Sequence, residues 1–494
     1  MTTELYRSDK LFIDGEFVDP IDGEIIESID PSTGRPWALA AMGGAKDIDR
    51  AVAAARAALK GPWGRLPAAG RANLLRTLAR LYEANAPRLA ELESRDNGQP
   101  LRDTRAATAG HPQWYNYYAG LAEHVEGRNV QIDPNAHIFT SRHPVGVVGA
   151  IIPWNAPLTT TTWKLVTALA AGCTIVIKAA EHTPVTAMEL ARLVAEAGIP
   201  PGVVNVVPGF GPVAGARLST NDDVDMISFT GEHRTAQQIM VNSAGTLKRL
   251  AFECGGKSPH IIFEDADLEQ ALNAATHSSF VNCGQVCTLG SRILVQKSVY
   301  RQVVDEIARR AAGIRIGNAL DPSTQMGPQT HKEQLEKTLR YIGIGKAEGA
   351  RIVAGGEAVS GEGLAGGYYV QPTVFADASN EMQSAREEIF GPVCSLIPFE
   401  TEEEAIAIAN DTIYGLVAGL WTQDIGRGHR VAAAVEAGTV WVNTYRYVRW
   451  AMPYGGFKIS GIGRENGPES LDDFTELKTT VINLTGRYPD AYAT

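Results

Sequence analysis

Cysteine is scarce in this chain, and no pair of cysteines has the spacing of a redox or zinc motif. The 494 residues include 5 Cys, an odd number, and no CxxC sequence occurs. A disulfide-stabilised scaffold is therefore excluded, and zinc-ribbon and thioredoxin-like sites lose their main sequence support. At least one thiol should be free. This cysteine usage predicts a protein of a reducing, cytoplasmic compartment.

Long apolar runs and basic blocks are also missing. No uncharged apolar stretch approaches the roughly 20 residues of a membrane span, and the N-terminal MTTELYRSDK lacks the apolar core of a signal peptide. Lys and Arg number 45 against 56 Asp and Glu, which gives a formal net charge of −11. These features predict a soluble protein and argue against nucleic acid or a membrane surface as a partner.

What the chain does contain is an alternation of short β-rich segments with helical ones. The first set of predicted strands lies at 148–154, 173–179, 203–208 and 225–231. A second set lies at 260–263, 291–296, 351–356, 394–399, 415–421 and 438–443. Strands separated by helices form parallel sheets, so an α/β fold with two such units is predicted. The β-prone tail at 477–486 has no helix beside it and should pair with another segment or another subunit.

Two glycine-bearing turns follow predicted strands of the first unit. GFGPVAG (209–215) fits G-x-G-x-x-A, in which glycines let the backbone approach a pyrophosphate, although an ordinary Gly-rich turn has the same pattern. FTGEHR (229–234) is the second turn, and together they favour a nucleotide. AFECGGKS (251–258) ends like a P-loop, but Ala251 stands where the first Gly is required. A nucleoside triphosphatase is therefore disfavoured.

Charged residues at the end of the second predicted strand could hold a ribose. Lys178 and Glu181 follow CTIVIK, and strand ends face the ligand crevice of an open α/β sheet. A donor and an acceptor at this spacing suit a ribose diol. A solvated pair on a loop is the alternative interpretation.

The segment FVNCGQVCTLGSR (280–292) carries the strongest candidate nucleophile. Cys287 has Gly284 and Gly290 on either side of it in the sequence, which leave room for a substrate to approach the thiol. A metal site with Cys283 is weakly supported, because histidines at ligand spacing are missing. An inert core cysteine is the other alternative, and Cys173 and Cys394 fit that description.

Glu253 is a candidate general base. It precedes a Gly-Gly turn, and a buried carboxyl can have a pKa raised toward neutrality. Glu253 and Cys287 are 34 positions apart with a predicted helix between them. Their meeting cannot be deduced from this spacing alone.

Seven segments in order resemble the NAD(P)-dependent aldehyde dehydrogenase superfamily, and the resemblance extends from about residue 10 to residue 485. They are PWNAP (153–157), VIKAAEHTP (176–184), FTGEHRTA (229–236), FECGGKSP (252–259), FVNCGQVCTLGSR (280–292), EEIFGPV (387–393) and PYGGFKISGIGRE (453–465). The resemblance implies that Cys287 adds to an aldehyde and that Asn155 donates to the oxyanion. A thioester would form, and Glu253 would activate the water that hydrolyses it.

The same resemblance implies a cofactor site for NAD, with NADP less favoured because Glu181 should repel a 2′-phosphate. No metal is implied. The implied cofactor residues are Lys178, Glu181, Gly211, Gly215, Thr230, Gly231, Glu232, Glu388, Phe390 and Trp154. Glu232 departs from the pattern, because many members have Ser there; a carboxylate suits a helix N-terminus but repels phosphate. Cys254, in place of Leu beside Glu253, is a second departure.

The implied fold is α/β with three parts. Residues 1–121 and 145–252 resemble a Rossmann-like NAD-binding domain, and residues 253–455 resemble an α/β catalytic domain. Residues 122–144 and 470–494 resemble a small β oligomerisation flap, which implies a homodimer or a homotetramer.

Substrate choice should depend on a helix and a loop. The helix carries threonines at positions where apolar residues would line an apolar tunnel. Four Thr follow PWNAP, and the loop TYRYVRWAMPYGG (444–456) places arginines beside aromatic residues. The candidate substrate residues are Thr160, Trp163, Tyr445, Arg446 and Arg449. Arginine beside aromatics suits a carboxylate or a flat ring, so a carboxylated or aromatic semialdehyde is predicted. For the arginines, the alternative is a pair on the surface. For the substrate, the alternative is an aliphatic or betaine-type aldehyde. For the function, the alternatives are a CoA-acylating dehydrogenase and a non-catalytic homologue.

Overall fold

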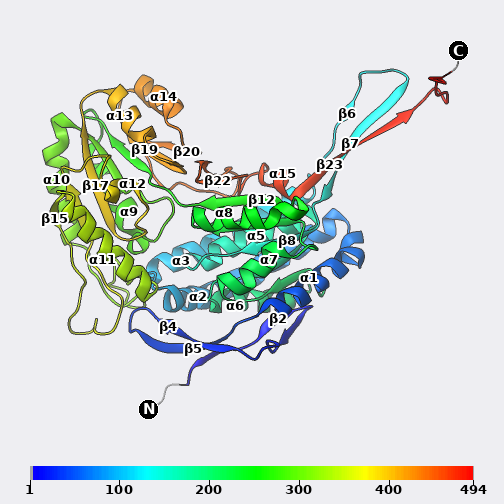
Figure 1. Cartoon of the computed structure of the whole chain (residues 1–494), viewed down its shortest axis with the longest axis horizontal. Helices are drawn as coiled ribbons and strands as arrows, with labels where there is room; N and C mark the ends of the chain where they lie inside the picture. Colours follow the sequence, from blue (N-terminus) through cyan, green and yellow to red (C-terminus); the bar gives the residue numbers. More distant parts are fainter. Residues whose placement is uncertain (1–3, 493–494) are drawn as a thin grey trace.

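A computed structural model of the chain describes residues 4–492 and contains two large sheets covered by helices (Figure 1). The first sheet has eight strands in the order β22-β12-β11-β8-β9-β10-β2-β3, and the second has seven in the order β15-β16-β17-β14-β13-β19-β20. In the first sheet the strands from β12 to β10 pair in parallel, whereas β22, β2 and β3 are added antiparallel; in the second sheet all pairs are parallel except that of the edge strand β15.

The first sheet contains the strands predicted between 148 and 231. Its strands are β2 (Leu11–Ile13), β3 (Glu16–Val18), β8 (Val147–Ile151), β9 (Thr174–Lys178), β10 (Val204–Val206), β11 (Met226–Gly231), β12 (Arg249–Cys254) and β22 (Gly461–Ile462). Its helices are α1 (Ala45–Lys60), α5 (Pro157–Ala171), α6 (Val185–Glu196), α7 (Ala216–Thr220) and α8 (His233–Ser243). Every residue of β8 and β9 is buried, as in a parallel strand that is covered on both faces.

The second sheet contains the strands predicted between 260 and 443. The predicted strands correspond to β13 (Pro259–Ile262), β14 (Arg292–Gln296), β15 (Arg351–Ala354), β17 (Val393–Phe399), β19 (Val417–Trp421) and β20 (Thr439–Val442). The sheet also contains β16 (Thr373–Ala376), which the sequence analysis did not predict. The covering helices are α9 (Leu268–Phe280), α10 (Lys297–Ala312), α11 (Lys332–Ala347), α12 (Gln383–Arg386), α13 (Glu402–Asn410) and α14 (Ile425–Ala434). Residues 255–258 connect β12 to β13, so the chain passes between the sheets beside Glu253. The chain returns to the first sheet at β22, which pairs with β12.

Smaller elements complete the two sheets. The long α2 (Ala68–Asn97) packs with α3 (Leu101–Gly110) and α4 (Pro112–Ala122) against α5 and α6. A separate N-terminal sheet lies beneath them in Figure 1; its strands are β1 (Tyr6–Ser8), β5 (Arg35–Ala41) and β4 (Ile25–Asp30). The short β18 (Tyr414–Gly415) pairs with β21 (Phe457–Lys458), and α15 (Ser470–Phe474) precedes the last strand.

A three-stranded flap projects away from the body (Figure 1). It consists of β6 (Asn129–Val130), β7 (Ala136–Pro144) and β23 (Thr475–Asn483), and β23 runs antiparallel to β7 along its whole length. The prediction that the tail strand pairs with another segment is therefore confirmed. Its contact with another subunit and the exact domain limits stay predictions.

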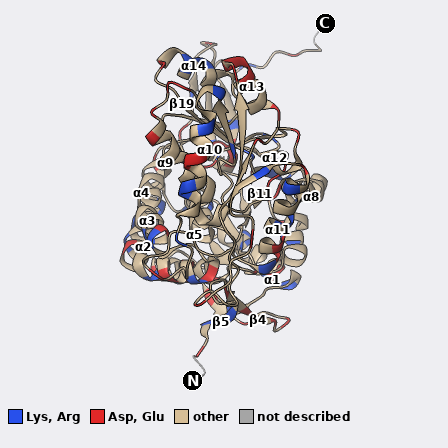
Figure 2. Cartoon of the chain, turned by 90° about the vertical axis from the view of Figure 1, so that its left-hand side faces the viewer, with Lys and Arg blue, Asp and Glu red and all other residues tan. Residues whose placement is uncertain are grey.

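Charged residues of both signs are scattered among the elements. In the view of Figure 2, Lys and Arg residues and Asp and Glu residues both occur on several of the helices. Across residues 4–492, no helix combines the length and the apolar character that crossing a membrane requires.

Candidate active site

The predicted site residues of the first sheet meet because of its topology. The carboxyl ends of parallel strands lie at one edge of a sheet, where open α/β folds bind ligands. Asn155 follows β8, Thr230 and Gly231 end β11, and Glu253 lies near the end of β12. They line a cavity of about 420 Å³. Twelve of the predicted residues line it: Trp154, Asn155, Thr160, Trp163, Thr230, Gly231, Glu232, Glu253, Cys287, Glu388, Phe390 and Arg446.

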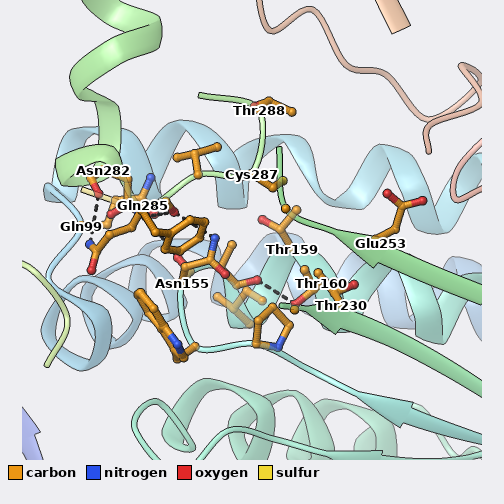
Figure 3. Close-up of a pocket in the computed structure, with 18 of the residues that line it drawn as sticks. Gln99, Asn155, Thr159, Thr160, Thr230, Glu253, Asn282, Gln285, Cys287 and Thr288 are labelled. Carbon is orange, nitrogen blue, oxygen red and sulfur yellow. Dashed lines mark hydrogen bonds between the residues drawn. The ribbon is translucent and has the colours of Figure 1, made fainter. Parts of the chain in front are cut away.

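The loop after α9 brings Cys287 from the second sheet to this cavity. Asn282 and Cys283 have left-handed backbones, with φ of 49° and 53°, a conformation that costs energy for residues other than glycine. Gly284 follows with φ of 73°, and a Cβ there would lie 2.0 Å from the Gly391 carbonyl. Only glycine permits this close approach. The resulting turn directs Cys287 into the cavity, where Figure 3 shows it between Glu253 and Asn155.

The thiol of Cys287 is accessible yet poorly solvated. The residue is half-buried, whereas the other four cysteines are buried. Burial raises the pKa of the Cys287 thiol to about 11, and the carboxyls of Glu253 and Glu388 also raise it. The hydroxyl of Tyr454, 3.4 Å from the sulfur, acts in the opposite direction. The thiol is therefore predominantly protonated near neutral pH in this state.

Asn155 is held at the base of the cavity by its neighbours. Its amide Nδ2 donates to the Gln285 carbonyl at 2.9 Å, on the same loop as Cys287. Its backbone carbonyl accepts hydrogen bonds from Asn97 at 3.3 Å and Asn282 at 3.2 Å. An asparagine amide carries two N–H donors, so one remains for a substrate oxygen.

Glu253 meets Cys287 across the cavity despite the 34 positions between them. Its side chain is buried, and its Oε2 has no hydrogen-bond partner among the residues that the structure describes. Burial raises the pKa of Glu253 well above its usual value, and Glu465 raises it further. Glu465 is itself paired with buried Lys164, which also donates to Ser228 at 2.9 Å. Glu253 thus has the environment of a carboxylate base with a pKa shifted toward neutrality.

The residues predicted to bind the cofactor fit such a ligand. The Oγ1 atom of Thr230 is buried and has no hydrogen-bond partner among residues 4–492, and the Glu388 carboxyl receives a hydrogen bond from the Gly256 N–H at 3.0 Å. Burial raises the pKa of Glu388 to about 7. A Cβ on Gly255 would lie 2.0 Å from Glu388 Oε2, so glycine at this position lets the Glu388 carboxyl lie against the backbone. The Thr230 hydroxyl, and the Glu388 carboxyl with its remaining acceptor capacity, are groups that suit ribose hydroxyls.

Four other predicted cofactor residues lie beside this cavity rather than on its wall. Lys178 Nζ is 3.3 Å from Glu181 Oε2, and the missing Cβ of Gly215 would be 3.9 Å from Lys178. No atom lies within 4 Å of the Cβ position of Gly211. A phosphate or ribose can therefore approach the backbone there.

The predicted substrate residues divide into two groups. Thr160, Trp163 and Arg446 line the cavity, whereas Tyr445 and Arg449 do not. Tyr445 stacks on His260 with ring centroids 4.9 Å apart, and the Arg449 guanidinium lies 4.3 Å from the Tyr447 ring. The left-handed backbone of Arg446, with φ of 57°, is the point where the loop turns toward the cavity.

Several residues of the cavity were not singled out by the sequence. Tyr454 and Glu465 both lie within the matched segment 453–465, so the segment itself was the available signal. Gln334 and Lys337 come from α11, which carries no motif, and the Gln334 amide donates to the Phe390 carbonyl at 2.9 Å. His111, which immediately precedes α4, is hydrogen-bonded to Thr159 at 3.1 Å, and both line the cavity. A cluster of three or more His, Cys, Asp or Glu residues suited to a metal is not present within residues 4–492.

Comparisons with known proteins show the family of the chain. A sequence profile of the aldehyde dehydrogenase family matches residues 17–480. An aldehyde dehydrogenase of Enchytraeus buchholzi is 45% identical over 481 residues, covering 96% of this chain and 95% of that protein. The chain belongs to the aldehyde dehydrogenase family.

Solved structures show the same fold. An aldehyde dehydrogenase of Bacillus cereus in complex with NAD⁺ is 46% identical, with a TM-score of 0.95 and 97% of each chain covered. A betaine aldehyde dehydrogenase of Staphylococcus aureus in complex with NAD⁺ is 37% identical, with a TM-score of 0.97; 99% of this chain and 97% of that one are covered. The predicted α/β fold and family are confirmed.

Proposed function

We propose that this protein oxidises an aldehyde to a carboxylic acid with NAD, with Cys287 as the nucleophile. The observation that carries the proposal is the convergence of Cys287, Asn155 and Glu253 on one cavity that also contains Thr230 and Glu388. The test is NADH formation by the purified protein with aliphatic, betaine-type, aromatic and ω-carboxy aldehydes. Absence of turnover with every aldehyde, despite bound NAD, would favour a non-catalytic homologue.

The side chains act in sequence on the substrate carbon. The Cys287 thiol gives its proton to solvent and the sulfur bonds to the carbonyl carbon, while the free N–H of Asn155 and the Cys287 backbone N–H stabilise the developing oxyanion. The chemistry that bound NAD supplies is acceptance of the hydride that leaves this carbon. Glu253 then takes a proton from water as the water oxygen bonds to the thioester carbon; the carbon–sulfur bond breaks, the acid leaves, and the sulfur is reprotonated.

The assignment of NAD over NADP depends on Glu181. Its carboxylate is paired with buried Lys178, and this pairing lowers the pKa of Glu181 against the opposing effect of burial. A 2′-phosphate placed at the ribose would meet this negative charge.

Removal of the Glu181 charge should relax this preference. In Glu181→Gln, kcat/KM with NADP should rise relative to NAD by about tenfold, because a repulsive charge at contact distance is removed and Lys178 becomes free to pair with phosphate. Initial rates with both cofactors on one preparation provide an internal control. A wild-type preference for NADP, or an unchanged ratio in the variant, would contradict the assignment.

We propose a carboxylated aldehyde as the substrate, with an aromatic semialdehyde within this class. Arg446 is half-buried on the cavity wall, and no carboxylate among residues 4–492 lies within ion-pair distance of it. Burial lowers the pKa of its guanidinium, which reflects the cost of an unpaired charge. The hydroxyls of Thr159 and Thr160 add polar groups. A betaine-type aldehyde is disfavoured, because its cation would face Arg446.

Replacement of Arg446 should therefore separate charged from neutral substrates. Arg446→Ala should raise KM for ω-carboxy aldehydes by about tenfold to a hundredfold relative to a neutral aldehyde of equal length, since a charge-assisted hydrogen bond is lost. Arg449→Ala is the matched comparison, because its guanidinium lies over Tyr447 outside the cavity lining. Equal KM changes for charged and neutral aldehydes would exclude binding of the substrate carboxylate by Arg446.

The proposed reaction includes hydrolysis of the thioester. The presence of Glu253 favours hydrolysis over transfer of the acyl group to coenzyme A, which product analysis with and without coenzyme A distinguishes.

The flap carries exposed Leu477, Val481 and Ile482 on β23, and these apolar side chains support self-association as a homodimer or homotetramer.

A further inference from the structure

Tyr454 makes a hydrogen bond to the candidate nucleophile. Its hydroxyl oxygen lies 3.4 Å from Cys287 Sγ. Within the described part of the chain neither group has another hydrogen-bond partner. The Tyr454 side chain is buried, with 4% exposure, so water does not compete freely for its O–H. A phenol with one available acceptor donates to that acceptor.

The position of the Tyr454 hydroxyl is fixed by its surroundings. The backbone of Tyr454 exchanges two hydrogen bonds with Glu465, at 2.6 and 2.7 Å. Its ring packs edge-on against Trp163, with centroids 5.5 Å apart. Burial and the neighbouring sulfur raise the pKa of Tyr454 well above its usual value, so the phenol remains a proton donor over the working pH range.

We propose that Tyr454 stabilises the thiolate of Cys287 by hydrogen bonding and holds the sulfur in its orientation toward the substrate. This inference rests on the proposed role of Cys287 as the nucleophile. A tyrosine in this position is a thiol-positioning residue that contacts the reacting sulfur directly.

The charges around the sulfur explain why such a donor matters. Glu253 of β12 and Glu388 both disfavour a negative sulfur, and burial does so more strongly. Arg446 acts in the opposite direction. Lys164 is already paired with Glu465 and does not reach the sulfur as a donor. Tyr454 is thus the one O–H or N–H side-chain donor among residues 4–492 in hydrogen-bond contact with Cys287 Sγ.

The test measures thiolate formation without requiring the full reaction. Cys287 is reacted with 2,2′-dithiodipyridine between about pH 7 and pH 10 in wild type and Tyr454→Phe, because the thiolate is the species that attacks a disulfide. Loss of one hydrogen bond to a charged group should raise the thiol pKa by about one unit. A less acidic thiol is intrinsically more nucleophilic, so the rate at a given pH should fall about threefold to fourfold.

The far-ultraviolet absorbance of the thiolate provides the second readout, as the difference between each protein and its Cys287→Ala counterpart. Tyr454→Phe should need a pH about one unit higher to reach the same thiolate fraction. Tyr369→Phe is the matched control, because Tyr369 is fully buried and donates to the Ser32 carbonyl at 3.0 Å, in a different part of the molecule. Its exchange rate and thiolate titration should equal those of wild type.

The outcomes separate this inference from the proposed function. A Tyr454→Phe protein with wild-type circular dichroism and an unchanged or faster exchange rate overturns the role of Tyr454, even if the enzyme oxidises aldehydes normally. A faster rate would mean that the hydroxyl shields the thiol instead of stabilising its anion. Aldehyde turnover that survives in Cys287→Ala refutes the proposed function, whereas the exchange rates still report the contact between Tyr454 and Cys287.

Discussion

Replacement of Cys287 by alanine is expected to lower kcat for aldehyde oxidation by at least about ten-thousandfold, because no other group in the cavity can form the covalent bond. The other four cysteines are buried, and Cys254, the one that also lines the cavity, is 3% exposed. Burial raises the pKa of Cys254 to about 12, which leaves it little thiolate to replace the missing nucleophile.

The loss in Cys287→Ala should lie in chemistry and not in cofactor binding. The affinity for NAD, measured by quenching of protein fluorescence, should stay within about twofold of wild type, because the proposed cofactor groups belong to other elements. Cys283→Ala is the matched control on the same loop. Cys283 is 1% exposed and packs in the core of the second sheet. Comparable loss of activity in both variants would indicate damage to the loop and would remove the support for Cys287.

The sequence could predict the α/β fold because the strands have a distinct local pattern, whereas the catalytic roles of Cys287, Asn155 and Glu253 came from the family resemblance and stay predictions. Buried runs such as TIVIK identify the strands of a parallel sheet, and the topology then places Asn155 and Glu253 at one edge. The glycines on either side of Cys287, Gly284 and Gly290, were equally visible in the sequence. Whether Glu253 meets Cys287 was not deducible, since residues 255–258 take the chain into the other sheet between them.

Contacts between distant segments were not predictable. Tyr454 and Cys287 are 167 positions apart, and Lys164 and Glu465 are 301 apart. Each pair meets because the chain returns to the first sheet through β22. No local pattern contains this information.

The arginine loop shows a different limit of sequence analysis. Arg446 and Arg449 are the same residue type in one short loop, but Arg446 lines the cavity whereas Arg449 lies over the Tyr447 ring. The backbone of Arg446 is left-handed. Left-handed conformations at residues other than glycine are sparsely populated and depend on the tertiary structure. Asn282, Cys283 and Phe390 share this conformation and also lie at or beside the cavity. Some of the left-handed positions therefore lie where functional groups are placed, and the sequence does not signal them.

Replacement of Glu253 by glutamine is expected to stop the enzyme after a single turnover. If Glu253 activates the hydrolytic water, Glu253→Gln should lower steady-state kcat by about a hundredfold to ten-thousandfold while the first hydride transfer proceeds. Rapid mixing of aldehyde and NAD with the variant should then give a burst of NADH close to one equivalent per site, followed by a slow phase. The acyl group should remain on Cys287, where mass spectrometry of the peptide that contains residue 287 would detect it.

The pH dependence of the wild-type slow step gives an independent measure of the same group. Burial and Glu465 raise the pKa of Glu253, so its basic form is present only above that raised pKa, and hydrolysis should accelerate as pH rises through it. In Glu253→Gln this dependence should disappear, and added small amines should restore hydrolysis or replace it by aminolysis. A variant with no burst would show that Glu253 is required before the thioester forms. In that case its role would be in generating the Cys287 thiolate, beside Tyr454, and not in activating water.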